Sequence, residues 1–318
     1  MTRAVVFAYH DVGVRCLKAL LSAGIDVPLV VSVPQDPDET LWYASVAETA
    51  RDYGCPLLLP SDANVPDMVE QISRLAPDFI FSFYYRSLIG DAILRQTKLG
   101  AFNMHGSLLP RYRGRAPVNW AILRGETTTG VTLHEMVQRA DAGAIVDQQS
   151  VPILIDDTAR DVFAKIAVAA ETVLVRSLPA LIDGSAPRRA QPIVPGEYFG
   201  RRKPEDGLID WQQSAASIHN LVRAVSPPFP GAFAMITGER WEIHRTRLHS
   251  AVASAAECGH KPASENNKHV ELTAVNGQCL IRCSDGSQLQ LLAAHRNEGS
   301  ASLADLIARA SRAPIKLT

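Results

Sequence analysis

The feature that most constrains the fold of this chain is an alternation, through its first half, of short apolar runs and stretches of helical periodicity. Residues 4–8 are all apolar, and Val14, Leu17 and Leu21 then recur at helical spacing before Gly24. Buried strands separated by helices of about ten residues are typical of a parallel, doubly wound α/β sheet. We therefore expect strands over 4–8, 27–33, 55–59, 79–83, 101–105, 130–134 and 144–146, and helices over 14–24, 41–53, 68–75, 88–96 and 156–178.

The pattern changes after residues 184–204, a stretch rich in Pro, Gly and Arg that we interpret as a linker. Residues 217–225 have helical periodicity, and short strand candidates follow, with turn signals at Asn276-Gly277 and Asp285-Gly286. This pattern predicts a small all-β or barrel-like second domain. Residues 249–268 are polar and rich in Ala, Ser and Asn, and we expect them to form a flexible loop. The expected strands are 232–236, 241–244, 270–274, 279–282 and 289–293.

The charge balance and the hydropathy of the chain argue against several classes of protein. Its 32 Lys and Arg residues against 33 Asp and Glu residues give a net charge of -1, whereas general nucleic-acid binders usually carry a basic excess. The sequence has no stretch of about 18 uncharged apolar residues. The apolar run after Arg3 lacks the length and the small-residue cleavage site of a secretory signal. We therefore predict a cytoplasmic protein with no membrane span and no nucleic-acid partner.

The five cysteines favour free thiols in a reducing compartment over a disulfide framework, because their number is odd and they are scattered. Cys279 and Cys283 are four residues apart, and Cys258 is two residues from His260. A zinc site would need a second compact pair of ligands nearby, and the sequence offers none. In a strand, Cys279 and Cys283 would point to the same face, so we expect small buried side chains and no metal site.

The strongest chemical signal is the continuous stretch 102–117. Asn103 and His105 alternate at the end of an apolar strand, so their side chains leave the strand on the same face. At the carboxyl end of a parallel strand, that face can open into the crevice where α/β proteins bind ligands. An amide donor can stabilise an oxyanion while a neighbouring imidazole moves a proton. Gly106 lets the backbone turn sharply immediately afterwards.

Other polar residues near this stretch allow more than one interpretation. Arg111, Arg113 and Arg115 could hold an anionic ligand or could form a solvated surface loop. A histidine that acts as acid or base usually has an orienting carboxylate, and Asp141 is the best candidate, although the residues alone leave that pairing open. The remaining histidines have no comparable neighbourhood, and we expect only structural roles for His10, His134, His219 and those near the C-terminus.

The motif Asn-x-His followed by Ser-Leu-Leu-Pro, with a later Asp-Ala-Gly, resembles the folate-dependent formyltransferases, which use 10-formyltetrahydrofolate as the formyl donor. The resemblance covers residues 3–235 well. The sequence most resembles the branch of this family that acts on nucleotide-linked amino sugars. Within that branch, it most resembles the formyltransferase domains of the bifunctional polymyxin-resistance enzymes. The similar segments are 5–11, 81–86, 88–89, 101–103, 105–110, 112–117, 139–146, 199–202, 222–225 and 230–233.

The resemblance implies functions for individual residues. His105 would transfer protons, Asn103 would stabilise the oxyanion, and Asp141 would raise the pKa of the histidine. No metal and no covalent enzyme intermediate would be needed. Ser87 stands where the polymyxin-resistance enzymes have His, a change that a backbone contact would tolerate. Folate contacts are implied at Ser87, Leu88, Ile89, Arg115, Val137, Gln138, Arg139, Ala140 and Asp141.

The resemblance also implies a Rossmann-like, mostly parallel sheet in an N-terminal catalytic domain and a smaller OB-like β-barrel after it. We place the catalytic domain at residues 1–200, the barrel at 205–305 and a tail at 306–318. From about Arg245 the likeness thins, which leaves the strand boundaries of the barrel open. The decarboxylase half of the bifunctional enzymes is missing from this sequence, so we expect the oxidative step on a separate chain.

The implied reaction is the transfer of a formyl group from 10-formyltetrahydrofolate to the amine of a nucleotide-linked amino sugar. UDP-4-amino-4-deoxy-L-arabinose is the first candidate, which would place the enzyme in lipid A modification and polymyxin resistance. Alternative acceptors are another nucleotide amino sugar or methionyl-tRNA, and the near-zero net charge argues against tRNA. A folate- or nucleotide-binding pseudoenzyme is the non-catalytic alternative, and the intact set of Asn103, His105 and Asp141 argues against it.

Overall fold

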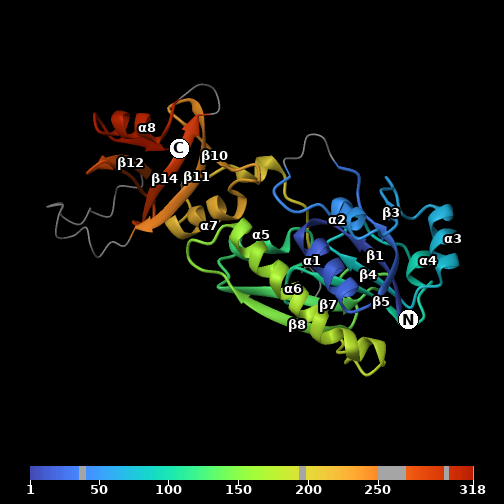
Figure 1. Ribbon diagram of the computed structural model, residues 1–318. Helices are drawn as coiled ribbons and strands as arrows, with labels where there is room; N and C mark the ends of the chain where they lie inside the picture. Colours follow the sequence, from blue (N-terminus) through green and yellow to red (C-terminus); the bar gives the residue numbers. More distant parts are fainter. Residues whose placement is uncertain (36–40, 193–197, 250–269, 297–300, 318) are drawn as a thin grey trace. The chain divides into compact units, whose positions relative to one another are not determined.

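The chain forms two compact units in a computed structural model that describes residues 1–35, 41–192, 198–249, 270–296 and 301–317 (Figure 1). The division is not a single cut of the chain. Two short segments, 119–127 and 154–160, belong to the second unit although the sequence on both sides of each belongs to the first. Unit 1 comprises Met1–Val118, Thr128–Ile153 and Asp161–Gly200, and unit 2 comprises Asn119–Thr127, Leu154–Arg160 and Arg201–Thr318.

Unit 1 is built on a seven-stranded, mostly parallel sheet with the strand order β3-β2-β1-β4-β5-β7-β8. The first five of these strands run parallel, whereas β7 runs antiparallel to both β5 and β8. The strands are β1 (Arg3–Ala8), β2 (Asp26–Val31), β3 (Leu57–Leu58), β4 (Phe79–Phe83), β5 (Gly100–His105), β7 (Thr128–Glu135) and β8 (Ile145–Pro152). The helices are α1 (His10–Ser22), α2 (Val46–Asp52), α3 (Pro66–Leu75), α4 (Asp91–Leu94), α5 (Pro117–Leu123) and α6 (Ala159–Ile182), of which α5 and α6 begin or end in the segments of unit 2.

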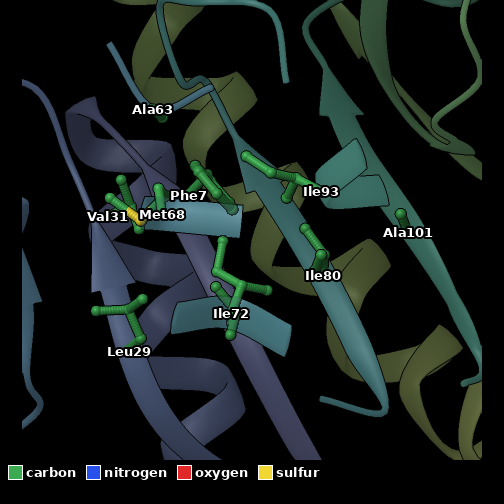
Figure 2. Close-up of a cluster of buried hydrophobic side chains, with 10 residues drawn as sticks. Phe7, Leu29, Val31, Ala63, Met68, Ile72, Ile80, Ile93 and Ala101 are labelled. Atoms are coloured by element: carbon green, nitrogen blue, oxygen red, sulfur yellow. The ribbon is translucent and has the colours of Figure 1, made fainter. Parts of the chain in front are cut away.

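One face of this sheet buries a cluster of apolar side chains, which we call the α3 cluster (Figure 2). Phe7, Leu29 and Ile80 reach it from three neighbouring strands, and Met68 and Ile72 reach it from α3. The two α3 residues are four positions apart, which places them on the same face of the helix. Strands that are apolar on both faces need helices on both sides of the sheet, and the alternation in the sequence reflects this requirement.

Helix α2 begins later than the periodicity of the sequence suggests. We expect a helix from residue 41, but the structure begins it at Val46. The side chain of Ser45 accepts a hydrogen bond from the backbone N–H of Glu48 at 3.2 Å and so caps the helix at this point. A polar residue that satisfies the first free N–H groups fixes a helix start more strongly than apolar spacing does.

Unit 2 contains a six-stranded antiparallel sheet in the order β10-β11-β14-β13-β12-β15. Its first and last strands, β10 and β15, approach each other, so the sheet is nearly closed and barrel-like. The predicted fold class is therefore confirmed: a mostly parallel α/β sheet and a smaller β-barrel. The elements are the 3₁₀ helix η1 (Pro204–Gly207), α7 (Ala215–Val225), β10 (Ala232–Ile236), β11 (Glu239–His249), β12 (Val270–Val275), β13 (Gln278–Arg282), β14 (Gln288–Arg296), α8 (Leu303–Ala310) and β15 (Ile315–Leu317).

The residues after 305 belong to this barrel and do not form a tail. Leu306 of α8 is fully buried, and β15 pairs with β12 through Ile315 opposite Leu272. A helix of eight residues and a strand of three are too short for their periodicity to stand out in the sequence. From residue 250 onward, the predicted loop 249–268 lies outside the described residues.

Cys279 and Cys283 are buried in unit 2, and burial raises the pKa of their thiols to about 12 and about 11.

Among the helices that the structure describes, none has both the length and the apolar character needed to cross a membrane.

Candidate active site

Asn103 and His105 lie near the carboxyl end of β5, inside the sheet of unit 1. Phe102 and Met104, which alternate with them, are buried on the opposite face of the strand. His105 is only 6% exposed, and Asn103 is half-buried. Both side chains are thus positioned by a strand that has a partner on each side, β4 and β7, which gives the pair a rigid support.

Asp141 is held against His105 by the loop between β7 and β8. Its Oδ1 lies 3.5 Å from His105 Nδ1, and its Oδ2 accepts the backbone N–H of Gly114 at 2.8 Å. Its φ of 54° lies in the left-handed region, which Asp adopts more readily than most residues. The loop therefore places a carboxylate beside the imidazole, and the pairing that the residues alone left open is present.

The proton positions on His105 follow from its two neighbours. Nε2 lies 2.9 Å from the carbonyl oxygen of Tyr112, which can only accept, so Nε2 carries a proton and donates it to this bond. In the neutral ring the lone pair is then on Nδ1, the nitrogen that faces Asp141. When Nδ1 takes up a proton, the positive charge lies next to a carboxylate. This geometry suits a group that accepts and returns one proton at Nδ1.

His134, for which the sequence indicates only a structural role, belongs to the same cluster. The antiparallel pairing of β5 and β7 places it directly opposite Asn103. Its Nδ1 lies 2.7 Å from the carbonyl oxygen of Glu135 and must carry a proton there, which leaves Nε2 as an acceptor. Nε2 accepts a hydrogen bond from Asn103 Nδ2 at 3.1 Å and lies 3.7 Å from Asp141 Oδ1.

Burial keeps His134 neutral. Desolvation of the fully enclosed ring lowers its pKa to about 4, and the nearby carboxylate of Asp141 only partly offsets this effect. A charged imidazole would lose its acceptor at Nε2, so the hydrogen bond from Asn103 exists only in the neutral form. His134 thus holds the Asn103 amide group in one orientation at neutral pH.

Two contacts fix the loop that carries Asp141. Gln191 Nε2 donates to the carbonyl oxygens of Asp141 at 3.2 Å and of Gly143 at 2.6 Å. The backbone at Gly143 packs so closely that a Cβ atom there would lie 2.0 Å from the carbonyl oxygen of Glu135. Only glycine permits this approach. The position of the carboxylate therefore depends on backbone packing two residues away from it.

Two of the loops predicted to bind folate pack on the same side of the sheet. Ile89, in the loop after β4, and Met136, at the start of the loop after β7, both pack against the α3 cluster. Each loop also exposes an apolar side chain: Leu88 is 71% exposed and Val137 is 45% exposed. The other predicted folate residues on these loops are Ser87, Gln138 and Arg139, which are exposed, and Ala140, which is half-buried.

The three arginines of the stretch 102–117 differ in environment. Arg113 is 3% exposed, whereas Arg111 and Arg115 are exposed. The backbone N–H of Arg115 donates to the carbonyl oxygen of Phe199 at 2.9 Å, where β6 (Arg113–Gly114) pairs with β9 (Tyr198–Phe199). Arg115 directly follows Gly114, which binds Asp141, so its chain position is adjacent to the carboxylate.

A surface groove elsewhere in unit 1 runs between α1 and α6, where Arg15 Nη1 and Glu171 Oε2 form an ion pair of 2.7 Å. Its lining includes none of the predicted site residues. Shape alone would direct attention to this groove. The convergence of Asn103, His105 and Asp141 instead identifies the candidate active site.

Comparisons with known proteins identify the family of the chain. The N-terminal domain of the family described as formyl transferase matches residues 3–178, and its C-terminal domain matches residues 201–310. The first match contains Asn103, His105 and Asp141, the three predicted catalytic residues. The two matches together span both units.

Solved structures with the same fold include several N-formyltransferases. The N-formyltransferase from Helicobacter canadensis, in complex with folinic acid and dTDP-3-aminofucose, is 21% identical with a TM-score of 0.70, over 92% of this chain and 99% of that one. WlaRD, a sugar 3N-formyltransferase in the presence of dTDP and 5-N-formyl-THF, is 21% identical with a TM-score of 0.68, over 94% and 99%. A sugar N-formyltransferase from Shewanella sp. FDAARGOS_354 is 18% identical with a TM-score of 0.61, over 77% and 97%.

Proposed function

The chain belongs to the formyl transferase family and is a formyl-transferring enzyme, and from this premise we propose that it moves the formyl group of 10-formyltetrahydrofolate to the amine of a nucleotide-linked amino sugar. The observation that carries the proposal is the set of Asn103, His105 and Asp141, in which a carboxylate lies 3.5 Å from the imidazole of a buried histidine. Acyl transfer to an amine requires an oxyanion donor and a group that relays a proton, and this set contains both.

The proposed step balances without a further reactant. The neutral amine attacks the formyl carbon, the carbonyl oxygen takes the negative charge, and the bond from the carbon to folate N10 breaks as the carbonyl reforms. The amine loses one proton and N10 gains one. His105 takes up the first proton at Nδ1 beside Asp141 and delivers the second, so that the enzyme ends as it began.

Asn103 stabilises the negative charge that develops on the carbonyl oxygen. One of its two amide N–H groups donates to His134, which leaves the other to donate to the oxyanion. A single donor of this kind typically contributes about 3 kcal/mol to the stabilisation of the transition state. Proton relay by a histidine typically contributes about 10²- to 10⁴-fold in rate.

The co-substrate would bind along the loops after β4 and β7. Their exposed apolar side chains, Leu88 and Val137, offer contact area for the flat ring of a folate. Arg115 offers a cation for an anionic part of the ligand, from a position next to the Gly114–Asp141 hydrogen bond. Two of the N-formyltransferases of similar fold were solved with folinic acid or 5-N-formyl-THF, which supports a folate here.

For the acceptor, we propose a nucleotide-linked amino sugar and place UDP-4-amino-4-deoxy-L-arabinose first, on the motifs around residues 81–86 and 199–202. dTDP-3-amino sugars are the next candidates, because the Helicobacter canadensis enzyme was solved with dTDP-3-aminofucose. A net charge of -1 disfavours methionyl-tRNA, whose phosphates favour a basic protein surface.

A turnover assay tests the proposal. Purified protein is incubated with 10-formyltetrahydrofolate and, separately, with UDP-4-amino-4-deoxy-L-arabinose, dTDP-3-aminofucose and methionyl-tRNA, and tetrahydrofolate release is followed. We expect release with an amino-sugar nucleotide. Release with methionyl-tRNA alone would refute the proposed acceptor class. Folate binding without turnover of any acceptor would instead indicate a pseudoenzyme.

The variant Asp141→Asn tests the role of the carboxylate. Asparagine is nearly the same size and its carbonyl oxygen still accepts from the N–H of Gly114, but it lacks the negative charge beside His105. We expect kcat to fall by at least about 100-fold, with an unchanged melting temperature. An Asp141→Asn enzyme with wild-type kcat would remove Asp141 from the mechanism.

A further inference from the structure

Two histidines and a glutamate form a compact group on the outer face of the barrel in unit 2. Glu242 and His244 are two residues apart on β11, so both point away from the interior, into which Trp241 and Ile243 are buried. His295 of β14 pairs directly with Glu242 across the two strands. The backbone hydrogen bonds of the sheet therefore set the spacing of all three side chains.

The ligand atoms of this group are close to one another. Glu242 Oε2 lies 3.4 Å from His244 Nε2 and 3.2 Å from His295 Nε2, and all three atoms fall within 4.8 Å of each other. The two imidazole rings are nearly perpendicular, with centroids 4.3 Å apart. The two ring nitrogens thus approach one carboxylate oxygen from different directions.

We propose that Glu242, His244 and His295 form a zinc site with three protein ligands and a fourth position for water. Zinc bonds of about 2.0–2.2 Å in a tetrahedron place neighbouring ligand atoms about 3.3–3.5 Å apart. The distance of 3.4 Å from Glu242 to His244 lies in this range, and the distance of 3.2 Å to His295 is just below it. Two imidazoles and one carboxylate are a ligand set that zinc uses in proteins. The inference is independent of the proposed formyl transfer, because no residue of the candidate active site takes part.

The surroundings suit a cation. Zinc binds imidazole in its neutral form, and both imidazoles present Nε2 to the same carboxylate oxygen of Glu242. A Cβ atom at residue 231 would lie 3.6 Å from His244 Nε2, and Gly231 leaves this space open.

Isothermal titration of the tag-free full chain with Zn²⁺ tests the site. We expect one zinc ion per chain and a rise in melting temperature on binding. His295→Ala and Glu242→Gln should each weaken zinc binding by more than about tenfold. His295 is exposed and Glu242→Gln preserves shape, so both variants should keep the zinc-free melting temperature of the wild type.

Control variants alter cysteine and histidine residues that are not part of the proposed site. Cys258→Ser and His260→Ala alter the Cys258–His260 pair, and His249→Ala alters another histidine of β11. We expect all three to bind zinc as the wild type does. The proposal fails if the wild type binds no zinc, if zinc binding survives in the double variant His244→Ala/His295→Ala, or if Cys258→Ser abolishes it.

Discussion

His134 governs the orientation of the Asn103 amide through a hydrogen bond that only one tautomer of the ring can accept. The carbonyl oxygen of Glu135 holds the proton on Nδ1, and Nε2 is left to face the amide N–H of Asn103. Without this acceptor the amide group could rotate and present its oxygen instead of its N–H to the substrate. We regard His134 as a positioning residue for the proposed oxyanion donor.

The variants His134→Leu and His134→Gln test this role. Leu removes the acceptor, and we expect kcat to fall by about 10- to 100-fold with little change in KM for either substrate. Gln offers a carbonyl oxygen to Asn103 and should recover part of kcat. Steady-state kinetics with both substrates measure the effect. A purely structural role would lower the melting temperature of both variants and leave the kcat of the folded enzyme unchanged.

The low pKa of His134 predicts how stability depends on pH. The pKa of His134 is about 4 in the folded chain against 6.5 for an unperturbed histidine, so between these values the unfolded state binds more protons. Stability therefore falls as the pH drops from about 6.5 to about 4. Urea unfolding at several pH values measures this loss.

The matched variant is again His134→Gln, which cannot titrate. Its free energy of unfolding should depend on pH less steeply than that of the wild type between pH 4 and 6.5. The difference in slope corresponds to at most one proton that the wild type binds on unfolding and the variant does not. Its absolute stability does not matter, because the comparison is between slopes. Parallel curves for the two proteins would contradict a lowered pKa at His134.

At the scale of elements, the loop between β7 and β8 connects packing to chemistry. Asp141 has no strand or helix of its own, and its place depends on Gln191 and on the close approach at Gly143. The sequence shows the Asp-Ala-Gly motif but not this approach, because the clash partner is a backbone oxygen of Glu135, eight residues away and on another element.

Gly143→Ala tests this connection. Its Cβ would overlap the carbonyl oxygen of Glu135, so the loop must shift, at a cost of about 1–3 kcal/mol in stability. We expect a lower melting temperature and a lower kcat, since Asp141 moves with the loop. A kcat equal to that of the wild type would show that the loop position is not critical.

The elements also show what the sequence could predict. Most strands of the parallel sheet were predictable, because burial on both faces makes them continuously apolar. Asn103 and His105 were predictable as neighbours because one strand carries both. The contact of Asn103 with His134 could not be predicted, because it depends on the register of β5 against β7. These two strands pair antiparallel and are 23 residues apart in the chain. The β11–β14 group depends on register in the same way.

For the molecule as a whole, the end of the described chain is part of the barrel. Leu306 is fully buried in α8, and β15 is an edge strand of the sheet. The interior of unit 2 is therefore incomplete without these residues. The predicted boundary at 305 would cut through α8.

Leu306→Ala measures this contribution. Removing a fully buried leucine side chain costs about 2–5 kcal/mol, so we expect a clear fall in the stability of the protein. Arg312→Ala, at an exposed position shortly after α8, should leave stability within about 0.5 kcal/mol of the wild type. Differential scanning calorimetry of both variants makes the comparison. If Leu306→Ala left the stability of the protein unchanged, the residues after 305 would behave as a tail.

The interrupted course of unit 2 along the chain has a consequence for protein synthesis. Asn119 donates its side-chain amide to the carbonyl oxygen of Ala224, and Arg223 binds the carbonyl oxygens of Leu154 and Asp157, all within unit 2. On the ribosome, the sheet of unit 1 is complete once β8, which ends at Pro152, has emerged, but segment 119–127 then still lacks its partner in α7, and so does segment 154–160 when it emerges next. They must wait until α7 has been translated. The order of translation thus leaves these polar groups of the two segments without their partners until α7 has been made.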